Sequence, residues 1–269
     1  MYENRLTAFI DILGFSALVE ESDNSSEVTQ NILNAITLMI PSSLEEHCKI
    51  TPSSKVTSDL ESVSNDANHM NEMLAELFEV RISQFSDCMV LSAKANCVMS
   101  CNMILEMIAK FSIKIWEDNK LLIRGGMTVG KLYHKDKEVI FGPAMIEAYK
   151  LEATLAEHPR ILVKNECIAS FKAPGANDLF ESIVTKSDDG FYQITLASAF
   201  RYMINDSSLN LSELETVNEL IREYDCLEAE LDEIGKRQQS ARVKNKYNWA
   251  KDNVRELDVS INKKQRRSY

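Results

Sequence analysis

The alternation of apolar and polar positions along the chain predicts a series of strands. Residues 6–13 are apolar on both faces apart from Asp11, which indicates a buried strand. Residues 79–92 are typical of two strands joined by a tight turn at Ser86 and Asp87. Further strands are expected over residues 121–129 and 160–163, with a hairpin arm over 131–140 and a strand, a turn and a strand over 180–195.

Helical spacing of apolar residues fills the intervals between these strands. A helix over residues 15–39 is expected to start after Gly14 and to end at Pro41. A long apolar helix over 93–116 and a shorter one over 144–157 follow. Strands that alternate with helices predict an α/β (α+β) sandwich, in which a mixed sheet is flanked by helices.

The chain divides into a domain over residues 1–206 and a C-terminal helical extension over 207–269. Within the first part, residues 40–73 are polar and rich in serine and asparagine, which predicts an insertion between helices. In the extension, apolar residues recur at helical spacing, with an interruption at Gly235. This pattern leaves open whether the apolar stripe packs on its own domain or on a second subunit.

The composition fits one large domain, or one domain with an appendage. The chain has 269 residues, and 45% of them are hydrophobic, which is enough for a sizeable core. The formal net charge of -11 argues against nucleic acid as a partner. We expect no membrane contact and a cytoplasmic location, because no apolar run reaches the length of a membrane span and the first residues do not resemble a signal peptide. The six cysteines lack metal-ligand spacing and are expected to be buried thiols in a reducing compartment.

Asp11 is the first candidate for chemistry. An ionised carboxylate inside an apolar strand is costly unless a cation pairs with it. The strand is followed by Gly14 and a predicted helix, an arrangement that suits a metal-bound phosphate. Asp87, at the tip of the predicted hairpin, would supply a second carboxylate, so that the pair could hold two divalent ions. The alternative is that Asp11 only caps a junction between a strand and a helix.

Five motifs, taken in order, resemble the class III nucleotidyl cyclases. They are IDILGFS, FSDCMVLS, RGGMTVG, AYKLEA and HPRILV, and they lie within residues 5–165. Within that class the chain is most similar to the bacterial anti-phage pyrimidine cyclases of the Pycsar type. The resemblance implies the mixed-sheet fold of the class and a reaction that joins a ribose 3′-oxygen to its own α-phosphate and releases pyrophosphate. It also implies a defence signal that a downstream cyclic-nucleotide effector protein reads.

The resemblance assigns a metal-binding side to the site. Asp11 and Asp87 match the two metal-binding aspartates of the family, and the backbone carbonyl of Ile12 completes the set. The expected cofactors are two divalent ions, Mn²⁺ or Mg²⁺, which prefer oxygen ligands. The residues expected to bind the triphosphate are Gly14, Phe15 and Ser16, through backbone amides, and the side chain of Arg124. The alternative for Arg124 is a structural arginine held in a salt bridge.

The chain departs from the purine cyclases of the class at several positions. Their Asn-x3-Arg pair corresponds here to Ile146 and Lys150. Lys150 keeps a cation that would stabilise charge on the transferring phosphate, but Ile146 cannot orient a ribose as an asparagine would. The residues that read adenine correspond to Ser83 and Val139, which cannot do so. Either the base is different, therefore, or the enzyme is inactive.

Arg81 and Ser83 are the candidates for reading a different base. Strand alternation places both on the same face as Phe85 and Asp87. Arginine only donates hydrogen bonds, and uracil presents an acceptor where cytosine presents an amine. UTP is therefore favoured over CTP as the substrate.

The resemblance further implies a head-to-tail homodimer with composite sites. Asp11 and Asp87 would come from one chain and Lys150 from the other. Two alternatives to a pyrimidine cyclase stay open. One is an adenylyl or guanylyl cyclase with rearranged base contacts. The other is a catalytically silent nucleotide-sensing domain whose helical tail recruits a partner; the two aspartates count against it, and Ile146 and Lys150 count for it.

Overall fold

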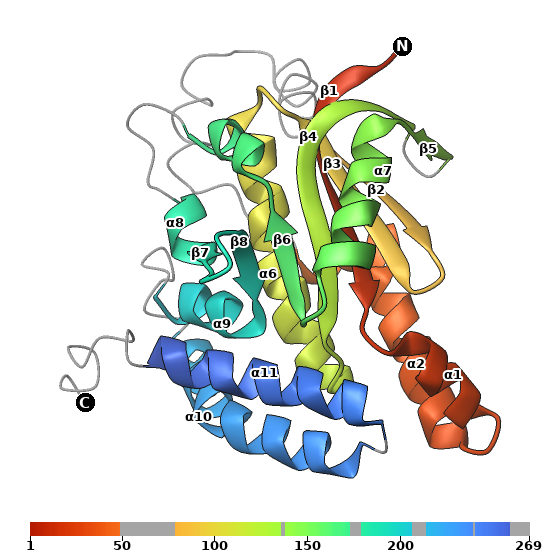
Figure 1. The fold of residues 1–269 in the computed structure, drawn as a ribbon, viewed down its shortest axis with the longest axis vertical. Helices are drawn as coiled ribbons and strands as arrows, with labels where there is room; N and C mark the ends of the chain where they lie inside the picture. The colour runs from red at the N-terminus through yellow and green to blue at the C-terminus, as the bar shows by residue number, and fades with distance from the viewer. Residues whose placement is uncertain (49–78, 136–137, 173–178, 206–213, 239, 259–269) are drawn as a thin grey trace.

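The protein is described by a computed structural model over residues 1–48, 79–135, 138–172, 179–205, 214–238 and 240–258 (Figure 1). Its strands are β1 (Glu3–Ile12), β2 (Val80–Phe85), β3 (Cys88–Lys94), β4 (Ile123–Lys135), β5 (Val139–Phe141), β6 (Arg160–Val163), β7 (Thr185–Lys186) and β8 (Tyr192–Thr195). They form one eight-stranded sheet in the order β2-β3-β1-β4-β6-β8-β7, and β5 pairs with β4 outside this order. The sheet is mixed, because β4 and β6 run parallel and the other pairs are antiparallel.

The central strand β1 has two unlike faces. One face lies in the main core, on the side of helix α6 (Val98–Asn119), and carries Leu6, Ala8, Ile10 and Ile12. The opposite face lies under helix α7 (Pro143–Lys150) and carries Arg5, Thr7, Phe9 and Asp11. Gly126 of β4, which pairs with Phe9, lets α7 approach closely, since a Cβ atom there would lie 2.4 Å from the carbonyl oxygen of Ala148. Asp11 therefore stands at the end of the more polar face.

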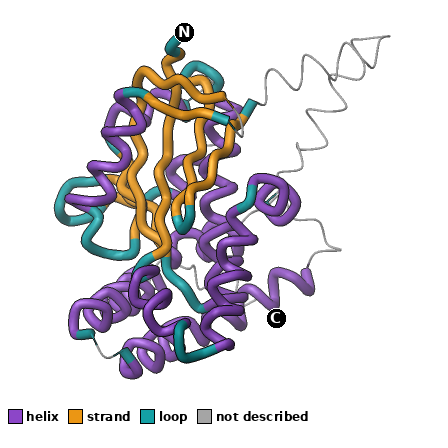
Figure 2. The backbone as a smooth tube through the Cα atoms, turned by 90° about the vertical axis from the view of Figure 1, so that its right-hand side faces the viewer, coloured by secondary structure: helices purple, strands orange, loops and turns teal. Residues whose placement is uncertain are grey.

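Helices cover both faces of the sheet and lie beyond one of its ends, as the turned view shows (Figure 2). Besides α6 and α7, they are α1 (Phe15–Ser22), α2 (Ser26–Met39), α3 (Pro41–His47), α8 (Leu179–Ile183), α9 (Leu196–Asn205), α10 (Leu214–Arg237) and α11 (Ala241–Asp258). A π-helical turn, Leu151–Leu155, continues α7, and a 3₁₀ helix, Asn165–Ser170, follows β6. Of the helices in the described ranges, none is both long and apolar enough to cross a membrane.

The C-terminal helices α10 and α11 form an antiparallel hairpin that packs on its own chain. Ion pairs join the two helices, with Lys251 Nζ 2.7 Å from Asp232 Oδ1 and Arg255 bound to Glu228. Their buried side chains belong to the same core as the sheet: Leu220, Tyr224, Leu227, Leu231, Tyr247, Ala250 and Val254. The apolar stripe of the C-terminal extension therefore packs on its own domain, one of the two possibilities that the sequence left open.

The predicted architecture of a mixed sheet flanked by helices is confirmed, and so are the strands at β1, β2, β3 and β6. The helix expected over residues 15–39 is broken, because Ser25 accepts a hydrogen bond from the amide of Val28 and caps a new helix there. Pro41 begins α3 instead of only ending α2, since proline is well suited to the first position of a helix. Gly235 lies inside α10, and Tyr247 of α11 packs against it.

Other element boundaries also differ from the predictions. Residues 179–183, expected in part as a strand, form α8. The first residues of the helix expected over 93–116 extend β3, and β4 continues to Lys135 through the expected hairpin arm. In these cases packing onto neighbouring elements outweighs the local pattern. Most of the predicted insertion, from residue 49 on, lies outside the described residues, as do 206–213 and 259–269 of the extension.

Candidate functional site

Asp11, Cys88 and Arg124 lie side by side on three neighbouring strands. The register pairs Asp11 of β1 with Cys88 of β3 on one side and with Arg124 of β4 on the other. The Cys88 Sγ atom lies 3.3 Å from Asp11 Oδ1, and Arg124 Nε donates to Asp11 Oδ2 at 3.1 Å. The two oxygens of this carboxylate therefore have different partners.

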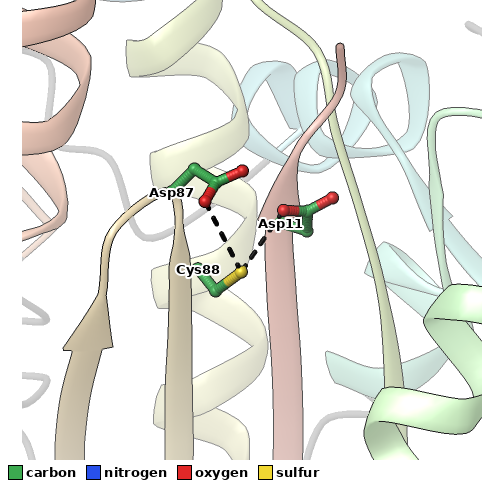
Figure 3. A group of neighbouring side chains, drawn as sticks. All are labelled: Asp11, Asp87 and Cys88. Carbon is green, nitrogen blue, oxygen red and sulfur yellow. Dashed lines mark hydrogen bonds between the residues drawn. The ribbon is translucent and has the colours of Figure 1, made fainter. Parts of the chain in front are cut away.

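Asp87 reaches Asp11 through the tight turn between β2 and β3. Ser86 takes a φ of 52°, and the Asp87 carbonyl oxygen accepts from the amide of Ile12 at 3.2 Å. Asp87 Oδ1 lies 3.9 Å from Cys88 Sγ, so the two carboxylates and the thiol face one another (Figure 3). One ligand atom from each of the three residues lies within 4.8 Å of the others, a spacing at which they could hold a metal ion.

A third carboxylate, that of Glu152, lies behind this group. It comes from the π-helical turn after α7, is only 3% exposed, and has its Oε1 atom 2.7 Å from Arg124 Nη2. Burial raises the pKa of both Asp11 and Glu152, and the charge of Arg124 opposes that rise. Arg124 is thus held between two buried acids at the border of the candidate metal group.

The turn at Gly14 leads directly from β1 into α1. Gly14 has a φ of 81°, a left-handed conformation that glycine adopts without strain, and its carbonyl accepts from Ala17 and Leu18. Phe15 and Ser16 are the first residues of α1, so their amides belong to the helix terminus whose donors lack partners within the helix. Gly14, Phe15 and Ser16, which are expected to bind phosphate through their amides, therefore begin two residues beyond the end of β1.

Arg81 and Ser83 take part in a buried polar cluster at the other end of the same face. Ser83 Oγ lies 2.9 Å from His134 Nε2, and the other ring nitrogen of His134 lies 2.8 Å from Ser92 Oγ. Arg81 pairs with Glu79 and donates to the His134 carbonyl. The predicted shared face is thus present, but both candidate base readers already have partners within the chain.

Lys150 and Ile146 lie on the outer surface of α7. Both side chains are exposed; Lys164, through a hydrogen bond and its charge, lowers the pKa of the neighbouring Glu147, and the charge of Lys150 adds to this. Exposed apolar side chains surround this part of the helix and the neighbouring β5: Val139, Phe141, Ile146 and Tyr149. The structure therefore brings Asp11, Asp87 and Arg124 together but leaves Lys150 facing away from its own chain.

Lys246 of α11 lies near the candidate site, which the sequence pattern did not indicate. The pKa of Lys246 is lowered by its partial burial and then by the charges of Arg124 and Arg242, while Asp11 and Glu152 raise it. Cys88 and Glu152 were also missed as site residues. Both lie inside motifs that carried the family resemblance, so a signal for them existed, whereas Lys246 is one of several lysines in a polar helix.

No protein-family model and no curated protein matches this chain. Among solved structures, the adenylyl cyclase CyaB from P. aeruginosa is similar at a TM-score of 0.41 and 17% identity, over 72% of this chain and 95% of that one. A guanylyl cyclase domain of the RhoGC fusion protein from the aquatic fungus Blastocladiella emersonii matches at 0.39 and 15%, over 72% and 95%. A bacterial light-regulated adenylyl cyclase matches at 0.39 and 14%, over 83% and 98%. These similarities are distant, so the activity has to be inferred from the residues of the site.

Proposed function

We propose that this chain is a metal-dependent nucleotidyl cyclase that converts a pyrimidine nucleoside triphosphate, UTP in preference to CTP, into its 3′,5′-cyclic monophosphate and pyrophosphate. The observation that carries the proposal is the approach of Asp11, at the end of β1, and Asp87, in the turn between β2 and β3, close to where β1 leads into the Gly14 turn. Two carboxylates next to a phosphate-binding turn are what a two-metal displacement at phosphorus needs.

The donor atoms of this site fit a divalent ion. Asp11 and Asp87 supply carboxylate oxygens, which suit Mn²⁺ and Mg²⁺, and the Ile12 backbone lies beside them. When bound, two such ions supply activation of the attacking 3′-oxygen and stabilisation of the leaving pyrophosphate. The chain's own part is to hold the triphosphate through the amides of Phe15 and Ser16 and to place positive charge near it through Arg124.

The second half of the site would come from another copy of the chain. Lys150 is exposed on α7 and lies among the exposed apolar residues Ile146, Tyr149 and Phe141. An apolar surface around a catalytic cation suits a two-fold pair in which each copy completes the other's site. There Lys150 would stabilise the charge that develops on the transferring phosphate.

The pyrimidine assignment rests on residues that cannot read a purine. Ile146 has no group for the ribose, and Val139 and Ser83 offer nothing equivalent to a purine-reading pair. The Arg81 side chain pairs with Glu79 and is still 25% exposed. Arginine can only donate hydrogen bonds, which favours uracil, with its acceptor oxygen, over cytosine, with its amine. The anti-phage role, with a cyclic-nucleotide effector downstream, is proposed from the motif resemblance alone.

The test is to incubate the protein with each of the four labelled ribonucleoside triphosphates and Mn²⁺ and to separate the products. We expect cyclic UMP as the main product and cyclic CMP as a minor one. Cyclic AMP or cyclic GMP as the main product would refute the pyrimidine assignment and show that the enzyme prefers a purine nucleotide. Binding of a nucleotide without turnover, in the presence of Mn²⁺, would favour the silent sensing domain instead.

A further inference from the structure

The C-terminal helix α11 crosses the end of the sheet at which β1 ends and β4 begins (Figure 1). Two contacts fix its place there. The Tyr247 hydroxyl lies 3.5 Å from the carbonyl oxygen of Lys120, just before β4, and the Trp249 ring stacks on His158, with centroids 4.9 Å apart. Tyr247 is buried and belongs to the main core, so the helix is firmly seated.

The same end of the sheet carries the Gly14 turn. Leu13, the residue before it, donates its amide to the Leu122 carbonyl at 2.8 Å, two residues on from the Lys120 carbonyl that faces Tyr247. Lys246 is the neighbour of Tyr247 and interacts electrostatically with Arg124, Asp11 and Glu152. The first turns of α11 therefore border the candidate phosphate site.

Two cations of α11 lie close to each other in this region. Arg242 and Lys246 lie four residues apart and share one face of α11, and no carboxylate of the described chain forms an ion pair with either. Arg124 is already neutralised by Asp11 and Glu152. Arg242 also lies in the first turn of a helix that has no acidic residue there, where a cation is unfavourable next to the helix dipole. A bound anion would offset each of these costs.

We infer that Lys246, assisted by Arg242, binds the terminal phosphates of the nucleoside triphosphate, so that the C-terminal hairpin forms one wall of the active site. This inference rests on the proposed function for the identity of the ligand, because it takes the Gly14 turn as the seat of the phosphates nearer the ribose. A partly buried lysine without a carboxylate partner is suited to this, since the ammonium is a compact charge that phosphate oxygens can approach directly. In a chain of net charge -11, such local cations are also what an anionic substrate requires.

The test compares Lys246→Ala with Lys244→Ala, an exposed lysine two positions earlier on the same helix. Calorimetric titration with inorganic tripolyphosphate and Mn²⁺ measures the anion site without any cyclisation. We expect Lys246→Ala to raise the Kd by about tenfold or more, Lys244→Ala to leave it unchanged, and Lys246→Arg to retain most of the affinity.

Thermal unfolding without ligand separates this role from a structural one. Burial and then the charges of Arg124 and Arg242 lower the pKa of Lys246, and they outweigh Asp11 and Glu152, so Lys246→Ala should leave the Tm unchanged or raise it, whereas removal of a structural lysine would lower it. An unaltered tripolyphosphate affinity in Lys246→Ala, or no binding by the wild type, overturns the inference. If the wild type binds tripolyphosphate through Lys246 but cyclises no nucleotide, the anion site stands and the cyclase proposal fails. If the wild type cyclises UTP and Lys246→Ala does so with the same KM, the cyclase proposal stands and the role of Lys246 in binding phosphate is refuted.

Discussion

Arg124 stands directly opposite Asp11 across the β1–β4 pair, with its Nε atom 3.1 Å from Asp11 Oδ2, and its other arm reaches Glu152. This single guanidinium is what makes two buried carboxylates tolerable at the end of an apolar strand. It leaves Asp11 Oδ1 directed toward Cys88, and Cys88 in turn lies beside Asp87. The site is thus charged and compact.

The two aspartates should be essential for turnover but not for folding. Asp11→Ala or Asp87→Ala removes a metal ligand, so we expect a loss of cyclase activity of at least about 100-fold with Mn²⁺, while Arg124 keeps Glu152 as a partner. Product formation from UTP and the thermal midpoint are the measurements. Asp118→Ala, an exposed aspartate near the end of α6, is the control and should retain full activity. Near-wild-type turnover in either site variant would refute the metal assignment.

Composite sites predict complementation between two inactive variants. Mixing Asp87→Ala with Lys150→Ala should restore about a quarter of the wild-type activity if subunits exchange freely, because a mixed dimer carries one intact site of two. The experiment needs Lys150→Ala to be inactive alone and subunit exchange to be demonstrated, for example by energy transfer between labelled chains. Proven exchange with no recovery would place the whole site within one chain.

The base preference should depend on Arg81. Arg81→Tyr replaces a group that only donates with one that also accepts from the cytosine amine, so the ratio of UTP to CTP turnover should fall by about tenfold or more. Because Arg81 also pairs with Glu79, thermal unfolding must accompany the kinetics. Glu79→Gln breaks the same pair without touching the proposed base contact and serves as the control. An unchanged ratio in Arg81→Tyr would remove Arg81 from the base site and leave the cyclase proposal intact.

The thiol between the two carboxylates should give the site affinity for thiophilic ions. A tetrahedral ion bound to a thiolate and a carboxylate oxygen holds the two ligand atoms about 3.6 Å apart. The Cys88 Sγ atom lies 3.3 and 3.9 Å from the two oxygens, so little movement is needed. Titration with Cd²⁺ should therefore produce sulfur-to-metal charge-transfer absorption that Cys88→Ser abolishes and Cys226→Ser, at an exposed cysteine, does not. Absorption that persists in Cys88→Ser would exclude this ligand.

A pair of acids joins the C-terminal hairpin to α6 and should make stability depend on pH. Burial, and a hydrogen bond that protonated Glu117 donates to the Glu223 carboxylate, raise the pKa of Glu117 from 4.5 to about 8. The folded chain therefore keeps a proton that the unfolded chain releases above pH 4.5, and stability falls as the pH rises from 4.5 through 8. Glu117→Gln removes this cost.

We expect Glu117→Gln to stabilise the protein by about 1–2 kcal/mol at pH 9, a value reduced from the full pKa shift because the pair is partly exposed to solvent. The gain should vanish below pH 4.5, where both states are protonated. Denaturant unfolding at several pH values measures it, with Glu21→Gln, at an exposed glutamate of α1, as a control that should show no such trend. A gain that is independent of pH would mean that the two acids do not share a proton.

Local pattern was enough to predict the central strand and both candidate metal ligands. Residues 6–13 are apolar on both faces, which predicts a buried strand, and the single acid among them made Asp11 a candidate site residue. The Ser86–Asp87 turn followed from two flanking strands, because a hairpin places its turn residues at a sheet end. These features depend on neighbours in sequence, and the structure reproduces them.

Only the tertiary structure decided what surrounds those ligands. Three residues near the site are distant in sequence from the residues they approach: Glu152, Lys246 and His134. The periodicity of a helix or strand does not indicate which distant element will pack beside it. The path of α11 past the end of the sheet was likewise undetermined, because its apolar stripe fits either its own core or another subunit. Long-range packing made that choice, since burying Tyr247 and Leu227 in the core of the sheet removes more apolar surface from water than leaving the hairpin exposed.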